Sequence, residues 1–420
     1  MVRLPRRGGN GMSVTSKLTT LGAAGSGGVV PAEFGSEVSS TQGLHAHTAN
    51  CVEIPNTNFI AVLAVHQTRD VYLHIVQVNG SNLTAVLRDT EHLDNNYNSD
   101  YGCGIAWNPQ NSKLVCLKLD TSGNFKGYQI EVNTANGQIT SNQSASLGNW
   151  SSGYRKPHRS QNILMHWKNE YFIQNTVRSN GERQVRTIQN YNNNNWSTYN
   201  WVGVGVTGDQ NTAHRIIRND TDTADHPTYD MGVYNNDTYL LGRYANLVST
   251  NSYDNSDMVS AQPILTGSDI GLASGWDNKR DKLHIYKTDG TGSDYADYRT
   301  YDNDTSRTSS LSQNPSSSGT DNTTSISGGL ANASFTEGAS GNVIGFGDKE
   351  FNSSALNVYQ FVYNDTGHVE VANILSASSR RHMKGTPGAY NTAQDCSLIV
   401  YRANTDNYNW YFRAMRGIIA

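Results

Sequence analysis

The chain has little of what several protein classes require. Only 16% of its 420 residues are charged and the net charge is −4, so it lacks the basic excess of a general nucleic-acid-binding protein. Nine prolines are too few for a proline-rich linker protein. Its four cysteines have neither metal-site spacing nor the density of a disulfide framework. These absences argue against nucleic-acid partners and against a cysteine-rich scaffold.

Long apolar runs and helical patterns are also missing. No apolar run reaches the roughly 18 residues that a transmembrane helix needs, so we expect no membrane insertion. The basic N-terminal segment has no apolar core of the kind found in secretory signals. Apolar residues do not recur at i, i+3, i+4 and i+7 over any long stretch, so we expect few helices.

Polar uncharged and aromatic residues are abundant. The chain has 47 Asn, 39 Gly, 23 Tyr and 7 Trp, and this aromatic content is too high for a disordered chain. Short alternating runs of Val, Ile, Tyr and Thr are bounded by Asn, Asp, Gly and Ser. This pattern predicts many short antiparallel strands.

One strand pattern, apolar-x-apolar with a frequent aromatic residue after it, recurs along the chain. It begins at residues 73, 115, 172, 240, 283, 356 and 398. Three of the six intervals are 42 or 43 residues, and we interpret the intervals of 57, 68 and 73 as that length plus insertions. A period of about 40–50 residues is typical of the blades of a β-propeller.

Each repeat reads as strand, polar turn, strand, Gly-containing turn and strand. Asn79-Gly80 and Asp289-Gly290 are examples of the second turn, and Asn-Gly and Asp-Gly suit the positive φ of tight hairpins. One such unit cannot bury both of its faces, so neighbouring units must stack, and radial closure leaves only short edges. The sequence therefore predicts an all-β fold, a β-propeller over residues 29–420. Seven blades are expected, with six or eight, or an irregular β-sandwich, as alternatives.

Three segments lie outside this pattern. Residues 1–28 form a Gly-rich stretch that we expect to be a flexible basic arm. Its charges come from four residues, for which we predict a role in assembly: Arg3, Arg6, Arg7 and Lys17. Residues near 200–228 and 304–340 read as polar insertions in the propeller. Sequence alone leaves open whether the first strand closes the ring with the last.

Motifs for catalysis are absent. The chain has no G-x-S-x-G elbow, no Walker A loop, no dinucleotide fingerprint and no sialidase box. We therefore predict no catalytic residues, no cofactor and no enzyme activity. A glycosidase would need two carboxylates facing each other across the scissile bond. Propeller enzymes draw such carboxylates from different blades, which a sequence cannot pair, so a polysaccharide-degrading enzyme stays open as an alternative.

Candidate metal ligands are sparse. His45 and His47 could lie on one side of a strand, but no third ligand is near them. The oxygen-rich segments Asp220–Asp230 and Asp302–Asp304 lack the calcium-binding pattern that ends in a bidentate Glu. We interpret all of these as turn or loop residues and predict no metal site.

Aromatic residues beside amides are the candidate ligand contacts. The run NNNNWSTYNW supplies Trp196, Tyr199 and Trp201, and the run YNWYF supplies Tyr408 and Trp410. Aromatic rings pack on the apolar faces of sugars, and amides bond their hydroxyls. The same composition also suits a wet protein interface, ordinary turns or a blade core.

A single basic cluster, Arg380–Lys384, lies in the propeller region. Such a run is either a solvated loop or a grip for an acidic partner or a phosphate. Both alternatives are kept open.

The segment Ser16–Gly28, SKLTTLGAAGSGG, resembles the start of virion proteins from tailed bacteriophages, particularly marine ones. The resemblance makes Met12 an alternative start. It implies a non-enzymatic structural protein of the virion, in the tail, fibre, baseplate or capsid surface, tethered by its N-terminal arm. Its implied partners are other virion proteins, further copies of itself and polysaccharide of the host surface. The alternative is a carbohydrate-binding or polysaccharide-degrading propeller.

Overall fold

The computed structural model describes most of the chain with gaps between its strands. The described residues are 30–43, 48–65, 70–95, 103–119, 124–149, 162–177, 182–199, 201–207, 214–218, 228–234, 237–244, 262–265, 269–277, 282–289, 296–302, 319–320, 331–337, 343–348, 356–363, 369–381, 383–403 and 409–418. Residues 1–28 and the four assembly residues predicted there lie outside this part.

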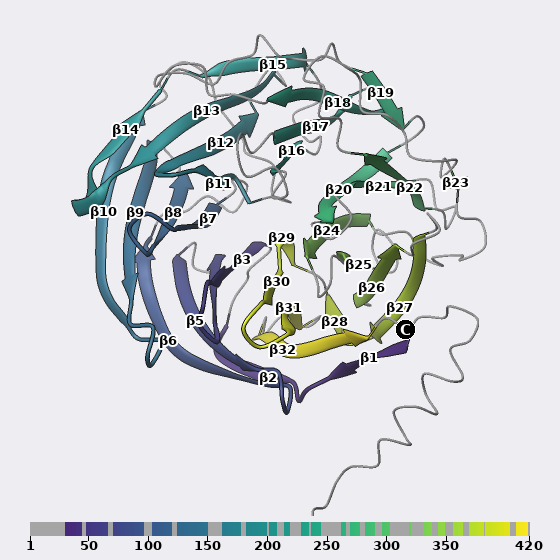
Figure 1. Ribbon diagram of the computed structural model, residues 1–420, viewed down its shortest axis with the longest axis horizontal. Helices are drawn as coiled ribbons and strands as arrows, with labels where there is room; N and C mark the ends of the chain where they lie inside the picture. Colours follow the sequence, from purple (N-terminus) through teal and green to yellow (C-terminus); the bar gives the residue numbers. More distant parts are fainter. Residues whose placement is uncertain are drawn as a thin grey trace, which may run out of the picture.

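The described strands form seven separate sheets. Figure 1 shows these sheets arranged as blades around a central axis. The protein is therefore a seven-bladed β-propeller, and the predicted fold class is confirmed.

Blades 1 to 3 follow one another from the N-terminal side. Blade 1 contains, from the inside outwards, β3 (Thr48–Ile54), β4 (Phe59–Val65), β5 (Val71–Asn79) and β6 (Thr84–Asp94). Blade 2 contains β7 (Cys103–Asn108), β8 (Lys113–Leu119), β9 (Asn124–Val132) and β10 (Ile139–Asn149). Blade 3 contains β11 (Leu164–Lys168), β12 (Tyr171–Val177), β13 (Glu182–Asn190) and β14 (Trp196–Thr198). In blade 3, β15 (Val202–Thr207) also pairs with β13, and the short 3₁₀ turn η1 (Asn192–Asn194) precedes β14.

Blades 4 to 6 repeat the same four-stranded order. Blade 4 contains β16 (His214–Arg218), β17 (Thr228–Tyr234), β18 (Asp237–Tyr244) and β19 (Gln262–Leu265). Blade 5 contains β20 (Asp269–Asp277), β21 (Lys282–Asp289), β22 (Ala296–Asp302) and β23 (Gly319–Thr320). Blade 6 contains β24 (Ala331–Glu337), β25 (Val343–Asp348), β26 (Leu356–Tyr363) and β27 (Val369–Ala377).

Blade 7 joins the two ends of the propeller. Its C-terminal part contains β28 (Arg380–Arg381), β30 (Gly388–Asn391), β31 (Cys396–Ala403) and β32 (Asn409–Ile418). Its outer edge comes from the N-terminal strands β1 (Val30–Phe34) and β2 (Val38–Gly43), which both pair antiparallel with β32. The first strands therefore close the ring with the last strand.

A second contact closes the same seam from the inside. The short strand β29 (Lys384–Thr386) leaves blade 7 and runs parallel to β3 of blade 1. Gly385 in this strand has φ +101°, and a Cβ atom there would lie 2.5 Å from the carbonyl oxygen of Ala49. Only glycine permits both this backbone conformation and this approach.

The repeat predicted from sequence has the right count but the wrong period. Each of the seven predicted strands falls in a different sheet, yet three of them, in β5, β18 and β26, are third strands of their blades. The second and third strands both carry alternating apolar residues. The recurring sequence pattern therefore matched the second strand in some blades and the third strand in others. Every interval of 42 or 43 residues runs from a third strand to the next second strand. The second strands begin at residues 59, 113, 171, 228, 282, 343 and 396, so the blade period is 53–61 residues.

The two predicted insertions contain parts of blades. Residues 200–228 include β15 and β16, and residues 304–340 include β23 and β24. Both β16 and β24 are the first strands of their blades. Their polar composition hid these strands from a hydrophobic pattern search.

Burial explains why inner and outer strands differ in composition. All seven residues of β4 are buried, since this strand packs between two neighbouring blades. The outer strand β10 reads ITSNQSASLGN and is largely exposed. A strand buried on both faces needs apolar side chains throughout, whereas an outer strand does not.

Asparagine side chains link neighbouring blades. Asn391 of blade 7 donates from Nδ2 to the carbonyl oxygen of Thr57 in blade 1, at 3.1 Å. Asn162, just before blade 3, donates to the carbonyl oxygen of Ile105 in blade 2 at 2.7 Å and accepts from its N–H at 2.9 Å. These bonds satisfy backbone groups that no strand of the same blade can reach, which gives part of the Asn content a structural role.

The turns between first and second strands, and between third and fourth strands, share one side of the ring, because each blade is an antiparallel meander. We call this side the short-turn face. Its described turns are residues 55–58, 80–83, 109–112, 133–138, 169–170, 191–195 and 392–395.

Candidate functional site

The structure corrects the prediction for Trp410. This residue has no exposed surface and lies in the core between blades 7 and 1. Its ring packs against His74, with centroids 4.8 Å apart, and against Phe412, at 5.2 Å. In this structure Trp410 therefore stabilises the seam and offers no surface to a ligand. Tyr408, predicted with it, lies outside the described residues.

Trp196 and Trp201 are half-buried and pack on the core shared by blades 1 to 3. The indole N–H of Trp196 donates to Oδ1 of Asn194 at 2.7 Å, within its own turn. The guanidinium of Arg186 lies 4.7 Å from the ring centroid of Trp201. These contacts assign both tryptophans a packing role between blades 2 and 3.

The segment Asn190–Asn194 before Trp196 holds blade 3 against blade 2. Gln129 of blade 2 is buried, and its Nε2 donates to Asn190 Oδ1 and to the carbonyl oxygen of Tyr191, both at 2.9 Å. Its Oε1 accepts from the backbone N–H of Asn194 at 2.9 Å. Asn193 and Asn194 adopt positive φ angles of 62° and 58°, which Asn tolerates better than most residues. This network fixes the turn that carries Tyr191.

Tyr199 is the predicted contact residue that belongs to a polar cluster at the short-turn face. We define the tyrosine cluster by five residues of blade 3: Glu170, Tyr171, Gln189, Tyr191 and Tyr199. Tyr191 is 40% exposed, and Val86 is the other large hydrophobic side chain that is exposed among the described residues.

Strand register brings these residues together. Tyr171 begins β12 and is the direct cross-strand partner of Gln189 in β13. The backbone N–H of Asn190 donates to the carbonyl oxygen of Glu170 at 2.9 Å, which joins the two turns. The N–H of Tyr199 donates to the carbonyl oxygen of Thr187 at 3.1 Å, so the chain after β14 stays beside β13.

A chain of hydrogen bonds runs through the cluster. The hydroxyl of Tyr199 donates to Oε1 of Gln189 at 2.7 Å. Nε2 of Gln189 donates to Oε1 of Glu170 at 2.9 Å. Both ends of the Gln189 amide are therefore assigned by their partners.

Burial and neighbouring groups keep the phenols protonated. Burial, followed by the neighbouring Tyr171 and Tyr191, raises the pKa of Tyr199 to about 12. Burial, followed by the charge of Glu170, also raises the pKa of Tyr171. These two hydroxyls therefore stay neutral hydrogen-bonding groups through the physiological pH range.

The cluster can bind a polar ligand with an apolar face. An exposed phenol ring offers a packing surface, and hydroxyl, amide and carboxylate groups lie beside it. Tyr199 could be predicted from the sequence, whereas the other four residues of the cluster could not. These residues come together only through the strand topology. Asn169–Tyr171 and Asn190–Asn192 lie at two turns, and the antiparallel meander places both turns on the same face of the blade.

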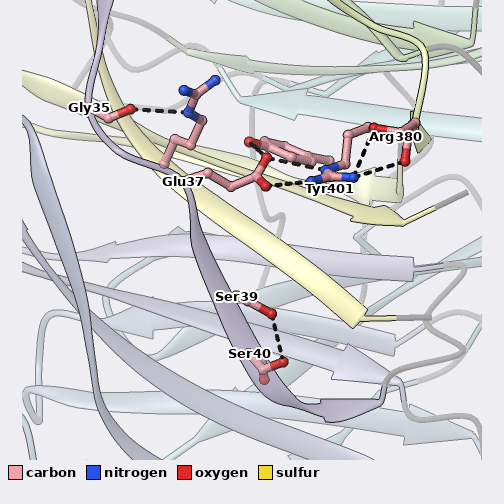
Figure 2. Close-up of polar contacts among 8 residues, drawn as sticks. Gly35, Glu37, Ser39, Ser40, Arg380 and Tyr401 are labelled. Carbon is pink, nitrogen blue, oxygen red and sulfur yellow. Dashed lines mark hydrogen bonds and ion pairs between the residues drawn. The ribbon is translucent and has the colours of Figure 1, made fainter. Parts of the chain in front are cut away.

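The basic cluster is tied to the chain itself at Arg380 (Figure 2). Nη2 of Arg380 lies 2.6 Å from Glu37 Oε1, and its Nε donates to Oε2 at 3.2 Å. The hydroxyl of Tyr401 donates to the same carboxylate at 2.7 Å. The guanidinium also lies 4.0 Å from the ring centroid of Tyr411. Arg380 is therefore bound to Glu37, the residue just before the closure strand β2, and a phosphate would have to displace Glu37.

Among the described residues, no group of three or more His, Cys, Asp or Glu side chains is placed to hold a metal ion. His45, His47 and residues 303–304 lie outside the described part, as do residues 220–227. Within the described part of the chain, the search for a helix long and apolar enough to cross a membrane finds none.

No protein-family model and no curated protein matches the chain. Among solved structures, the BP39L lectin from Burkholderia pseudomallei is 10% identical, with 90% of this chain and 98% of that chain covered and a TM-score of 0.48. The Cps50 (Swd1) β-propeller domain from Myceliophteria thermophila is 9% identical, with 91% and 99% covered and a TM-score of 0.45. AofleA from Arthrobotrys oligospora is 12% identical, with 82% and 90% covered and a TM-score of 0.43. At these values the similarities carry no argument about ligand or activity.

Proposed function

We propose that the protein is a carbohydrate-binding β-propeller and that the tyrosine cluster contacts the sugar. The observation that supports this proposal is the bond chain from Tyr199 through Gln189 to Glu170 beside the exposed ring of Tyr191. Sugars present an apolar face and a rim of hydroxyls, and the cluster presents the complementary groups. The predicted residue Tyr199 keeps a ligand role in this proposal.

The network behind the cluster supports binding without rearrangement. Gln129 holds the turn at both Tyr191 and Asn194, so the Tyr191 ring is presented on a fixed backbone. A preformed site loses less conformational entropy when it binds a ligand.

The test is binding of the full chain to a printed glycan array, followed by calorimetric titration of the best ligand. Tyr191→Ala is expected to weaken binding about tenfold or more, because it removes the stacking surface. Tyr390→Ala is the matched control. Tyr390 is a half-buried tyrosine on the short-turn face of blade 7, and its hydroxyl donates to Asp395 at 2.8 Å. Equal binding by both variants would overturn the assignment of the site.

The cluster contains one carboxylate, Glu170, whereas glycoside hydrolysis ordinarily requires two. Reducing-sugar release from the array ligand is the measurement that separates binding from hydrolysis. Turnover by the wild-type chain would replace the binding proposal with the enzymatic alternative.

The virion hypothesis stays a prediction. It places the chain on a phage particle with other virion proteins and further copies of itself, attached through the arm that contains Arg3, Arg6, Arg7 and Lys17. Mass spectrometry of purified virions should then find the chain at a fixed copy number. Its absence from particles would contradict the hypothesis and leave the sugar-binding proposal standing.

A further inference from the structure

The orientation of Gln189 decides which hydrogen-bonding groups the tyrosine cluster has left for a ligand. Its Nε2 is used by Glu170 and its Oε1 by Tyr199, so the amide is engaged at both ends. The Tyr199 hydroxyl also shares hydrogen bonds with Tyr171 and Tyr191, so its contacts lie within the cluster. Within the described part of the chain, the second oxygen of Glu170 has no hydrogen bond. The group left over in these contacts is therefore an acceptor, the second oxygen of Glu170.

The charge in the cluster is negative. Glu170 is its carboxylate, and among the described residues no Lys or Arg forms an ion pair with it. Lys168 is the nearest base in sequence, and it is paired with Tyr171 in the strand register. Burial, followed by the charge of Glu170, raises the pKa of the Tyr171 phenol.

We infer that the tyrosine cluster selects sugars that carry no acidic group and favours an amino sugar over its neutral counterpart. This inference rests on the proposed sugar-binding function and adds the ligand class. A carboxylate or sulfate on the ligand would lie near Glu170, whose charge no ion pair neutralises among the described residues. An ammonium group is a donor of three hydrogen bonds and pairs with the free oxygen of Glu170.

The expected preference is modest because the cluster is half-exposed. An exposed ion pair changes affinity by about three- to fivefold at moderate salt. A desolvated acidic group facing Glu170 loses at least a similar factor. The preference should shrink as sodium chloride rises, whereas stacking on Tyr191 should persist.

The experiment uses the full chain and three tetramers of equal length: a β-linked glucosamine tetramer, a β-linked glucose tetramer and a galacturonate tetramer. The same protein is applied to an array that carries neutral, amino and acidic glycans. The expected order of affinity is amino, neutral, acidic. Glu170→Gln should bring the ratio of amino to neutral binding close to one, and the ratio is read separately from any change in neutral binding itself.

Asp395→Asn is the matched control for Glu170→Gln. Asp395 is exposed on the short-turn face of blade 7, accepts a bond from Tyr390 and has φ 48°, a conformation that Asn also adopts. The substitution changes the net charge by the same amount as Glu170→Gln but leaves the cluster intact. If it reduced the amino preference equally, the preference would come from overall charge, and the inference would be wrong.

The remaining outcomes separate the inference from the proposed function. Binding of acidic glycans as tight as that of neutral glycans, still sensitive to Tyr191→Ala, would overturn the charge selection and keep the sugar site. Binding of no glycan of any class would overturn the proposed function and the inference with it.

Discussion

Glu37 and Arg380 are 343 residues apart in the chain and form a bidentate ion pair, with the shorter contact at 2.6 Å. Glu37 immediately precedes β2, which lies on the outer edge of blade 7, and Arg380 begins β28 on the inner edge of the same blade. The pair therefore joins the N-terminal closure strands to the C-terminal part of the blade. Both side chains are shielded enough for the contact to matter, with 27% and 21% of their surfaces exposed.

We predict that Glu37→Gln and Arg380→Met each lower the free energy of unfolding by about 1–3 kcal/mol. The double variant should lose less than the sum, because the two residues share one interaction. Urea unfolding of the four proteins measures this coupling. Additive losses would show that the pair does not hold the ring closed.

Chemical labelling of Cys396 and Cys116 can show whether the ring opens at blade 7 when the ion pair is removed. Both thiols are buried, and burial raises the pKa of Cys396 to about 11. Cys396 lies in the core between blades 7 and 1, whereas Cys116 lies in the core of blades 1 to 3. In Arg380→Met, thiol labelling should reach Cys396 sooner than in the wild type and leave Cys116 unchanged.

The ion pair should also weaken in acid. Burial alone would raise the pKa of Glu37, but hydrogen bonds from Arg380 and Tyr401 and the nearby positive charges lower it overall. A lowered folded-state pKa means that the stabilisation is present above the unfolded pKa and is lost as pH falls through the folded value. The coupling energy between Glu37 and Arg380 measured at pH 3 should therefore be smaller than at pH 7.

Protonation of Asp94 in acid should cause a larger loss of folding stability than protonation of Glu37. Burial by itself raises the pKa of Asp94, but hydrogen bonds from Lys126, Tyr128 and Lys118 bring it down to about 2. The stabilisation is present above about pH 4 and is lost towards pH 2, an amount of about 2 kcal/mol.

Asp94→Asn tests this directly at neutral pH. Lys118 is only 3% exposed and would lose its ion pair, so we expect a cost of about 3–5 kcal/mol. The variant should also lose the stability change between pH 4 and pH 2. A variant that keeps this change would assign it to another carboxylate.

Asn391 should matter for stability in a way that surface asparagines do not. Asn391→Ala removes the bond from this buried side chain to the part-buried carbonyl oxygen of Thr57, at a cost of about 1–3 kcal/mol. Asn136→Ala is the control, since Asn136 is exposed in the turn of blade 2, and should change stability by less than about 0.5 kcal/mol. Thermal unfolding of the two variants makes the comparison.

Substitutions at Trp410 and Tyr191 should separate effects on folding stability from effects on glycan binding. Trp410→Ala empties a fully buried site and should cost about 3–5 kcal/mol of stability. Tyr191→Ala should leave the unfolding midpoint nearly unchanged and reduce glycan binding. Loss of binding by folded Trp410→Phe, with its apolar ring retained, would restore Trp410 as a ligand contact.

Particular residues show where sequence reasoning succeeded and failed. Leu283 and Leu398 marked second strands, but Leu73 and Leu356 marked third strands, since both kinds of strand carry alternating apolar residues. Asn79-Gly80 was expected to use the positive φ of glycine. The positive angle in that turn belongs to Leu83, at 52°, and a Cβ on Gly80 would lie 1.6 Å from the carbonyl oxygen of Gln394. Glycine is needed there because blade 7 approaches.

The sequence by itself indicated an all-β propeller and favoured seven blades. The features that indicate the fold are patterns of neighbouring residues: alternating apolar positions, turn residues and the absence of helical periodicity. The same local patterns recur in each blade. Only the tertiary structure decided the partners of Glu37, the burial of Trp410 and the grouping of Tyr191 with Glu170. Those relationships join residues from different strands or opposite ends of the chain, and they follow from strand register and ring closure, which no local pattern encodes.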